Sequence, residues 1–187
     1  MHFWGRCGGG ATLFLVFRES WTDTTNSHNH PALSATFSKY LYSLAGIDLE
    51  DPAVWLEHRL KVFVDPGVAA MVGSAEGTVE TSAGPVSTRW SVDSNSNLAT
   101  LAAAVPVSFS AELHVVVPPA CRPEDVQVVE QWSGKLVYDG RAGGVAASTA
   151  MALGYDGASL VQHTHGGHTV RFVARSGHHA FYLHCGQ

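Results

Sequence analysis

A short polar loop, His28-Asn29-His30-Pro31, carries the residues of this sequence that are best suited to chemistry. Imidazole rings bind metal ions, hydrogen-bond to hydroxyl groups and transfer protons near neutral pH. Histidines two positions apart in a loop are poor chelators unless a third ligand comes from elsewhere. Spacing alone therefore favours a simpler interpretation, in which His28 and His30 lie beside the start of a helix and help to cap it.

A second candidate is the carboxylate of Glu19, which lies close in sequence to the indole of Trp21. Sites that act on sugars combine an acid for proton transfer with an aromatic ring that stacks on the sugar. Alone the pair is weak evidence, because a surface glutamate is the default interpretation. The other acidic residues fit exposed strand faces and turns: Glu76, Glu80, Glu112, Glu124, Asp125 and Glu130.

Histidines also gather near the end of the chain, at His163, His165, His168, His178, His179 and His184. Alternating strand positions can bring several of them to one face of a sheet. However, no carboxylate or cysteine is placed to complete a metal site, and Gly166-Gly167 marks a hairpin turn between them. Solvated hairpin histidines are the favoured interpretation, and the sequence predicts no metal and no other cofactor.

The element that must position the first loop is an amphipathic helix over residues 32–45. Pro31 suits the first helical turn, where its missing N–H costs nothing. Apolar residues then recur at spacings of three and four, which places them on one face: Ala32, Leu33, Phe37, Tyr40, Leu41 and Leu44. Gly46 follows as a C-terminal cap. An isolated helix of this length is marginal in water, so its apolar face must pack on another element.

The rest of the chain reads as β structure with almost no helical periodicity. Short strands are predicted over 60–66, 78–81, 86–92, 98–105, 111–117, 126–131, 135–138, 159–163, 169–174 and 180–184. Residues 82–85 and 93–97 have the composition of turns, and 140–158 that of a loop. We therefore predict a mainly β protein, with the helix in residues 1–47, a charged linker at 48–60 and an antiparallel β-sandwich over 61–187.

Composition excludes several classes of function. The 187 residues have a formal net charge of −5 and no Lys/Arg cluster, so we expect no nucleic-acid partner. No apolar run approaches the roughly 20 residues that span a bilayer, so we expect no membrane partner. Cys7, Cys121 and Cys185 indicate free thiols or one incidental bridge. Arg6 and the apolar residues 11–17 resemble a weak signal peptide without a cleavage site, which leaves the location open.

Taken together, several stretches of the chain resemble the α-L-rhamnosidase family of glycoside hydrolases. Residues 18–21 (RESW), 26–31 (NSHNHP) and 40–47 (YLYSLAGI) resemble the end of the catalytic barrel in that family. Residues 74–90, which contain SAEGTVET, GPVS and Trp90, resemble the glycine-rich hairpin of its C-terminal domain. Residues 112–118 (ELHVVVP) and 131–138 resemble later strands and turns of the same domain.

This resemblance implies a short remnant of a six-hairpin (α/α) barrel followed by the β-sandwich. It further implies inverting removal of terminal α-L-rhamnose, with a rhamnose-containing glycoside and the missing upstream barrel as partners. Glu19 is similar in position to the general base of the family and His30 to a histidine of the sugar pocket; Trp21 and Asn29 are further candidates for substrate binding. The general acid of the family lies upstream, which predicts that the chain alone is inactive.

Two departures and two alternatives stay open. The family runs into its glutamate as Thr-Thr-x-Trp-Glu, and in that register the base position would be Leu15. Residues 1–17 otherwise match poorly, which suggests truncation or an imperfect gene model. Alternatively, the sandwich is a carbohydrate-binding module that uses an exposed Trp90 or Trp132, or the helix over 32–45 mediates self-association.

Overall fold

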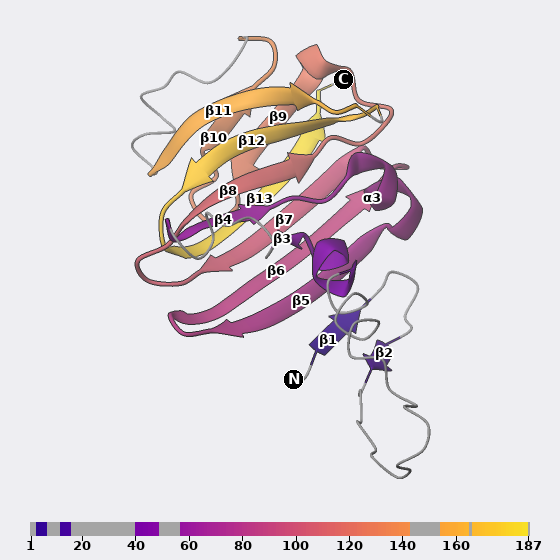
Figure 1. Ribbon diagram of the computed structural model, residues 1–187. Helices are drawn as coiled ribbons and strands as arrows, with labels where there is room; N and C mark the ends of the chain where they lie inside the picture. Colours follow the sequence, from indigo (N-terminus) through magenta and orange to yellow (C-terminus); the bar gives the residue numbers. More distant parts are fainter. Residues whose placement is uncertain are drawn as a thin grey trace, which may run out of the picture.

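Two β-sheets face each other in the computed structural model, which describes residues 3–6, 12–15, 40–48, 57–142, 154–164 and 166–186 (Figure 1). The first sheet has the order β10 (Leu136–Asp139), β9 (Val126–Glu130), β13 (Gly177–Cys185), β7 (Leu98–Val105), β6 (Gly84–Asp93) and β5 (Ser74–Thr81). The second has the order β11 (Tyr155–Gln162), β12 (His168–Ala174), β8 (Ser110–Val116), β4 (Arg59–Val62) and β3 (Ile47–Asp48). β1 (Phe3–Arg6) and β2 (Thr12–Leu15) pair separately.

Adjacent strands of the described sheets run antiparallel, except that β4 pairs with β8 in parallel. The predicted hairpin is present, because β5 and β6 pair from Thr81↔Gly84 to Ser74↔Ser91. The turn predicted at 93–97 is also present, and the Asp93 carboxylate accepts hydrogen bonds from the backbone N–H of Asn95 and Ser96 and from the Ser96 hydroxyl. The predicted antiparallel β-sandwich is therefore confirmed.

Strict alternation of side chains creates the core between the sheets. In β7, the residues that face inward are Ala99, Leu101, Ala103 and Val105, and the residues between them are more exposed. Fully buried aromatic and aliphatic residues from both sheets fill the interior, among them Phe172, Phe181, Leu113, Leu183 and Val128. Since successive side chains of a strand point to opposite faces, the same alternation leaves a second, outward row on each sheet.

Two local predictions are wrong. Residues 60–66 do not form one strand, because β4 ends at Val62 and the helix α3 (Pro66–Val72) begins soon after. Asp65 Oδ1 accepts hydrogen bonds from the N–H of Gly67 at 2.8 Å and of Val68 at 3.3 Å, with Pro66 in the first turn. A helix of seven residues is too short for a clear 3.6-residue period, although its Asp-Pro start is visible in the sequence.

Likewise, β11 begins at Tyr155, inside the predicted loop 140–158. The strand register shifts between Asp156 and Ser159, and Gly157 has φ 67°, so alternation is interrupted at this point. Such a bulge hides the start of a strand from a period-two pattern.

The predicted helix is partly described: residues 40–45 are helical, and 32–39 lie outside the described residues. Gly46 ends the helix with φ 83°, and its N–H donates to the Ser43 carbonyl oxygen at 3.0 Å. A Cβ at this position would lie 2.9 Å from Val64 Cγ2, so both backbone and space require glycine. The predicted C-terminal cap is therefore confirmed, while the division at residues 47 and 60 stays a prediction.

A disulfide joins Cys121, in the loop after β8, to Cys185 at the end of β13. Of the two interpretations left open by the sequence, the single bridge is therefore the one observed; Cys7 lies outside the described residues. Within the described ranges, no helix combines the length and the apolar character needed to cross a membrane.

Candidate functional site

A groove crosses the outer face of the six-stranded sheet over β5, β6, β7 and β13. Strand register aligns Ser87, Ala104 and His178 in one outward row, with Thr78 opposite Ser87. The next row contains Glu76, Arg89, Ala102 and Ala180. Small side chains in the middle of both rows leave a hollow of about 420 Å³.

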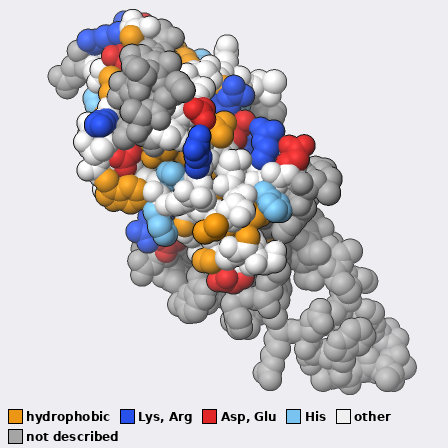
Figure 2. Space-filling model, turned by 90° about the vertical axis from the view of Figure 1, so that its left-hand side faces the viewer, with side chains coloured by type: hydrophobic (Ala, Val, Ile, Leu, Met, Phe, Trp, Pro, Cys, Tyr) orange, Lys and Arg blue, Asp and Glu red, His pale blue; other side chains and the backbone are white. Residues whose placement is uncertain are grey.

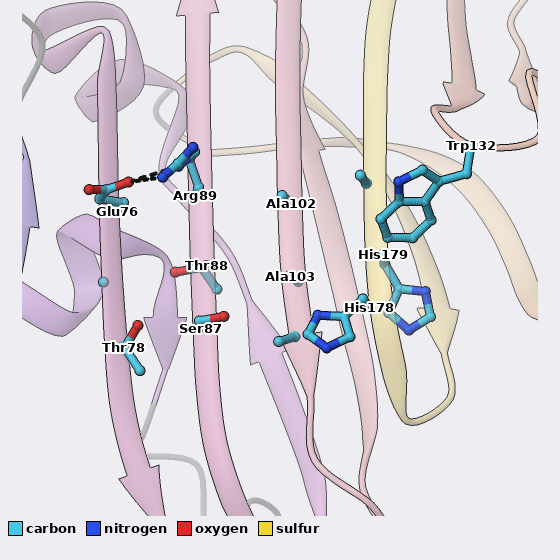
Figure 3. A pocket seen from close by; sticks show the side chains of 13 residues that line it. Glu76, Thr78, Ser87, Thr88, Arg89, Ala102, Ala103, Trp132, His178 and His179 are labelled. Atoms are coloured by element: carbon cyan, nitrogen blue, oxygen red, sulfur yellow. Dashed lines mark hydrogen bonds and ion pairs between the residues drawn. The ribbon is translucent and has the colours of Figure 1, made fainter.

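Charged and aromatic residues border this groove on opposite sides (Figure 3). On β6 and β5, Arg89 donates from Nε at 2.7 Å and from Nη2 at 2.6 Å to Glu76 Oε2. On the other side lie His178 and the indole of Trp132, which is 64% exposed. The groove therefore offers a flat apolar surface on one side and a charge-balanced polar pair on the other.

The backbone at Trp132 is held in place by Glu130. The Glu130 carboxylate accepts hydrogen bonds from the backbone N–H of Trp132 at 3.2 Å and of Ser133 at 2.7 Å. Burial raises the pKa of Glu130, but the hydrogen bonds from Ser133 and Trp132 together lower it by more, so the net shift is downward. Glu130 is only 4% exposed, which corrects the prediction that it lies on an exposed face or turn. A buried carboxylate here fixes the backbone of the turn that presents the indole.

The predicted solvated histidines divide into two groups. His178 is exposed, as predicted, whereas the neighbouring His179 points to the other face of β13. His179 Nε2 donates to the Arg175 carbonyl oxygen at 2.7 Å, so Nδ1 accepts from the Tyr155 hydroxyl at 3.2 Å. Burial and the charge of Glu130 raise the pKa of Tyr155 to about 12. His179 is thus half-buried, and both of its ring nitrogens have partners within the protein, so its ring is less solvated than that of His178.

A polar network occupies the outer face of the second sheet. His114 Nε2 lies 2.8 Å from Glu112 Oε1, and its Nδ1 lies 3.0 Å from Thr169 Oγ1. His163 Nε2 lies 2.8 Å from the same hydroxyl. If Glu112 is ionised and both histidines are neutral, His114 donates to Glu112, Thr169 donates to His114 and His163 donates to Thr169.

This order of carboxylate, imidazole and hydroxyl is also that of hydrolytic triads. Thr169, however, is 0% exposed, and His114 is 6% exposed behind the ring of Phe63. A nucleophile must reach its substrate, so we interpret the network as structural. Among the described residues, no group of three or more His, Cys, Asp or Glu is arranged to hold a metal ion.

The end of the first helix docks between the two sheets. Trp90 Nε1 donates to the Leu44 carbonyl oxygen at 2.9 Å, and Thr88 Oγ1 donates to that of Ala45 at 2.5 Å. Trp90 is only 2% exposed, so the alternative in which it forms an exposed sugar-stacking surface is wrong. A second hollow of about 430 Å³ lies at this junction, where Asp65 already caps α3.

The site residues predicted from the sequence, Glu19, Trp21, Asn29 and His30, lie outside the described residues and stay predictions. Two groups were missed by sequence reasoning, the Glu76–Arg89 pair and the Glu112–His114–Thr169 network. Glu112 and His114, two positions apart on a strand, were a usable signal for a shared face. Their partners come from other strands, and only the pairing of strands identifies them.

Comparison with known proteins shows which domains this sandwich resembles. Residues 60–130 match the family described as bacterial alpha-L-rhamnosidase C-terminal domain. The fold resembles the α-L-rhamnosidase of Dictyoglumus thermophilum, with a TM-score of 0.55 and 17% identity over 89% of this chain and 15% of that chain. The Streptomyces avermitilis α-L-rhamnosidase, solved with L-rhamnose, gives a TM-score of 0.47 and 23% identity over 79% of this chain and 11% of that chain. No curated protein matches the sequence.

The fold is therefore that of a β-sandwich domain, similar to one part of a much longer solved chain. More particularly, residues 60–130 of this sandwich are similar to the C-terminal domain of bacterial α-L-rhamnosidases. The chain spans about 15% of the length of the first of these solved structures.

Proposed function

We propose that this chain is the C-terminal part of an α-L-rhamnosidase-like glycoside hydrolase, in which the sandwich is a rigid accessory to the preceding helical unit. The observation that carries the proposal is the junction at residues 44–47. Ala45 and Ile47 are each 1% exposed, and β3 joins the second sheet through Ile47↔Val62. The chain that leaves the helix is thus built into the sandwich rather than joined to it by a free linker.

Hydrogen bonds at this junction satisfy carbonyl groups that a helix end leaves without intrahelical partners. Trp90 and Thr88 supply side-chain donors to Leu44 and Ala45, and the Phe63 N–H donates to the Gly46 carbonyl oxygen at 2.9 Å. Each bond contributes about 1 kcal/mol net. Together with the buried side chains, they support a fixed orientation of the helix on the sandwich.

The proposal includes the absence of hydrolysis by this chain alone. Inverting hydrolysis needs two carboxylates about 6.5–9.5 Å apart on either side of the bond that breaks. Glu76 is the one carboxylate among the described residues that line the outer groove, and Arg89 pairs with it. Glu19, the candidate base by resemblance, would have no acid partner without the upstream barrel.

An assay with an aryl α-L-rhamnoside tests this part of the proposal. We expect no turnover above background from the purified chain. Turnover that is lost in Glu19→Gln would contradict it, because that residue would then act in a complete site. Glu80→Gln is a suitable control, since Glu80 lies on the exposed side of β5.

Self-association through the helix over 32–45 stays a weaker alternative. Tyr40 is 61% exposed, but Ala45 packs into the core of the sandwich. Light scattering over a range of protein concentrations tests this alternative, for which the mass should rise with concentration.

A further inference from the structure

We propose that the groove on the outer face of the six-stranded sheet binds a neutral carbohydrate, with a sugar ring stacked on Trp132. This binding site is separate from the catalytic chemistry discussed above and does not depend on it. Four features of the groove lead to this ligand class: the exposed indole, the small floor, the polar pair and the balance of charge.

The indole of Trp132 is the first feature. Tryptophan is usually well covered in folded proteins, yet here the residue is 64% exposed. Its turn is held by the two hydrogen bonds that Glu130 accepts, so little backbone freedom is lost when a ligand binds. An exposed indole on a fixed backbone is suited to a ligand with one flat apolar face, and the C–H face of a pyranose ring is such a surface.

The floor of the groove is the second feature. Ala102 and Ala180 are opposite each other on β7 and β13, and Ala102 is opposite Arg89 on β6. Neighbouring strands lie about 4.8 Å apart, so these small residues separate Arg89 from β13 by about 10 Å. The resulting volume of about 420 Å³ falls within the range of ligand sites, about 300–1,000 Å³.

The polar side of the groove is the third feature. Arg89 uses Nε and Nη2 on a single carboxylate oxygen of Glu76, and a guanidinium has five N–H donors in one plane. Its side chain is 74% exposed. A planar donor beside a carboxylate acceptor can hydrogen-bond adjacent hydroxyl groups on a sugar ring, while His178 offers a further polar group on the other side.

The balance of charge is the fourth feature. Arg89 and Glu76 neutralise each other, so the groove provides no excess charge to attract a phosphate or carboxylate ligand. Figure 2 shows one face of the molecule, on which acidic and basic side chains are interspersed and no large patch has one sign. A neutral sugar fits this electrostatic environment better than nucleic acid or an acidic peptide.

Titration of the whole chain tests the inference. The probes are L-rhamnose, D-glucose, D-galactose and an aryl α-L-rhamnoside, followed by tryptophan fluorescence and by calorimetry. We expect at least one probe to give a saturable signal. Trp132→Ala should weaken it about tenfold or more, Trp132→Tyr should retain most of it, and Ala102→Leu should weaken it by filling the floor.

Tyr40→Ala is the matched control, because Tyr40 is similarly exposed (61%) but does not line the groove. It should bind the sugar as well as the unsubstituted chain does, and circular dichroism should confirm that every variant folds. Saturable binding that is unchanged in Trp132→Ala would overturn the inference. So would the absence of binding to all four probes, which would favour a protein surface as the occupant of the groove. Neither result bears on the helix junction, which is tested separately.

Discussion

Trp90 Nε1 lies 2.9 Å from the carbonyl oxygen of Leu44, and this hydrogen bond joins the centre of β6 to the end of the first helix. The two residues are 46 positions apart in sequence. Trp90 is buried at 2% exposure, and Thr88, two positions before it on the same face, makes the equivalent bond to Ala45. The inner face of β6 is therefore both part of the sandwich core and the binding surface for the preceding segment.

Replacing Trp90 with phenylalanine should loosen this junction. The change removes the donor and leaves the Leu44 carbonyl without this partner, which costs about 1–3 kcal/mol, and the smaller ring adds a cavity cost. Urea denaturation should show the loss, and hydrogen exchange should increase at residues 40–46. Trp132→Phe is the control, because its indole is exposed and its removal should change the free energy of unfolding little. Unchanged exchange at residues 40–46 in Trp90→Phe would contradict the docking role.

Gly46→Ala should destabilise the same junction for a different reason. The residue has φ 83°, and a Cβ would lie 2.9 Å from Val64 Cγ2. The left-handed conformation costs a non-glycine residue about 1–2 kcal/mol, and the close contact adds to it. Gly134→Ala is the matched control, because Gly134 has φ 65° and a Cβ there would meet no atom within 4 Å. Thermal or urea unfolding should therefore show a larger loss for Gly46→Ala, and equal losses would rule out the packing contribution.

The histidine network should make stability depend on pH. Burial lowers the pKa of His114 below its usual 6.5, and the hydrogen bond and charge of Glu112 only partly oppose this effect. Lys61 and His163 lower it further, and burial also lowers the pKa values of His163 and His179. The unfolded chain therefore binds protons more readily than the folded chain below about pH 6.5, and the free energy of unfolding falls as pH decreases through this range.

A second decrease in the free energy of unfolding should follow at lower pH. The pKa values of Glu112 and Glu130 are both lowered in the folded protein. Burial raises the pKa of each carboxylate, but other interactions outweigh it. His114 lowers the pKa of Glu112, and the hydrogen bonds from Ser133 and Trp132 lower that of Glu130. The stability that they contribute is present above about pH 4.5 and is lost as pH falls through their folded values. Urea midpoints measured from about pH 8 down to about pH 2 test both windows. His114→Gln should reduce the dependence of stability on pH in the window below about pH 6.5. His178→Gln, a change at an exposed residue, should leave that dependence unchanged. Parallel curves for His114→Gln and the unsubstituted chain would contradict the assignment.

Reduction of the Cys121–Cys185 bridge should lower stability. The bridged residues are 64 positions apart, and closing a loop of this length stabilises the folded state by about 4 kcal/mol in the chain-entropy model. Dithiothreitol should therefore lower the urea midpoint, and Cys121→Ser should cause a similar loss that no longer responds to reductant. A midpoint unaffected by reductant would show that the bridge does not contribute.

The sequence predicted strands, turns and the helix cap, because each of these features depends on residues close together along the chain. Residues 98–105 form β7 as predicted, and in the structure their burial alternates along the strand. Gly46 ends the helix as its position indicated, and Gly166-Gly167 lies in the predicted hairpin turn. These features follow from backbone preferences and the two-residue period of a strand.

Only the tertiary structure decided which strands pair and which side chains become buried. The sequence did not distinguish Trp90 from Trp132, yet Trp90 faces the opposite sheet and Trp132 stands on an exposed turn. In the sequence, Glu130 cannot be distinguished from a surface acid. In the structure, its carboxylate accepts hydrogen bonds from two N–H groups of the following turn. The groove itself combines residues from β5, β6, β7 and β13. Such contacts between distant segments leave no periodic trace in the sequence, since they depend on strand order and register, which are set by packing of the whole core.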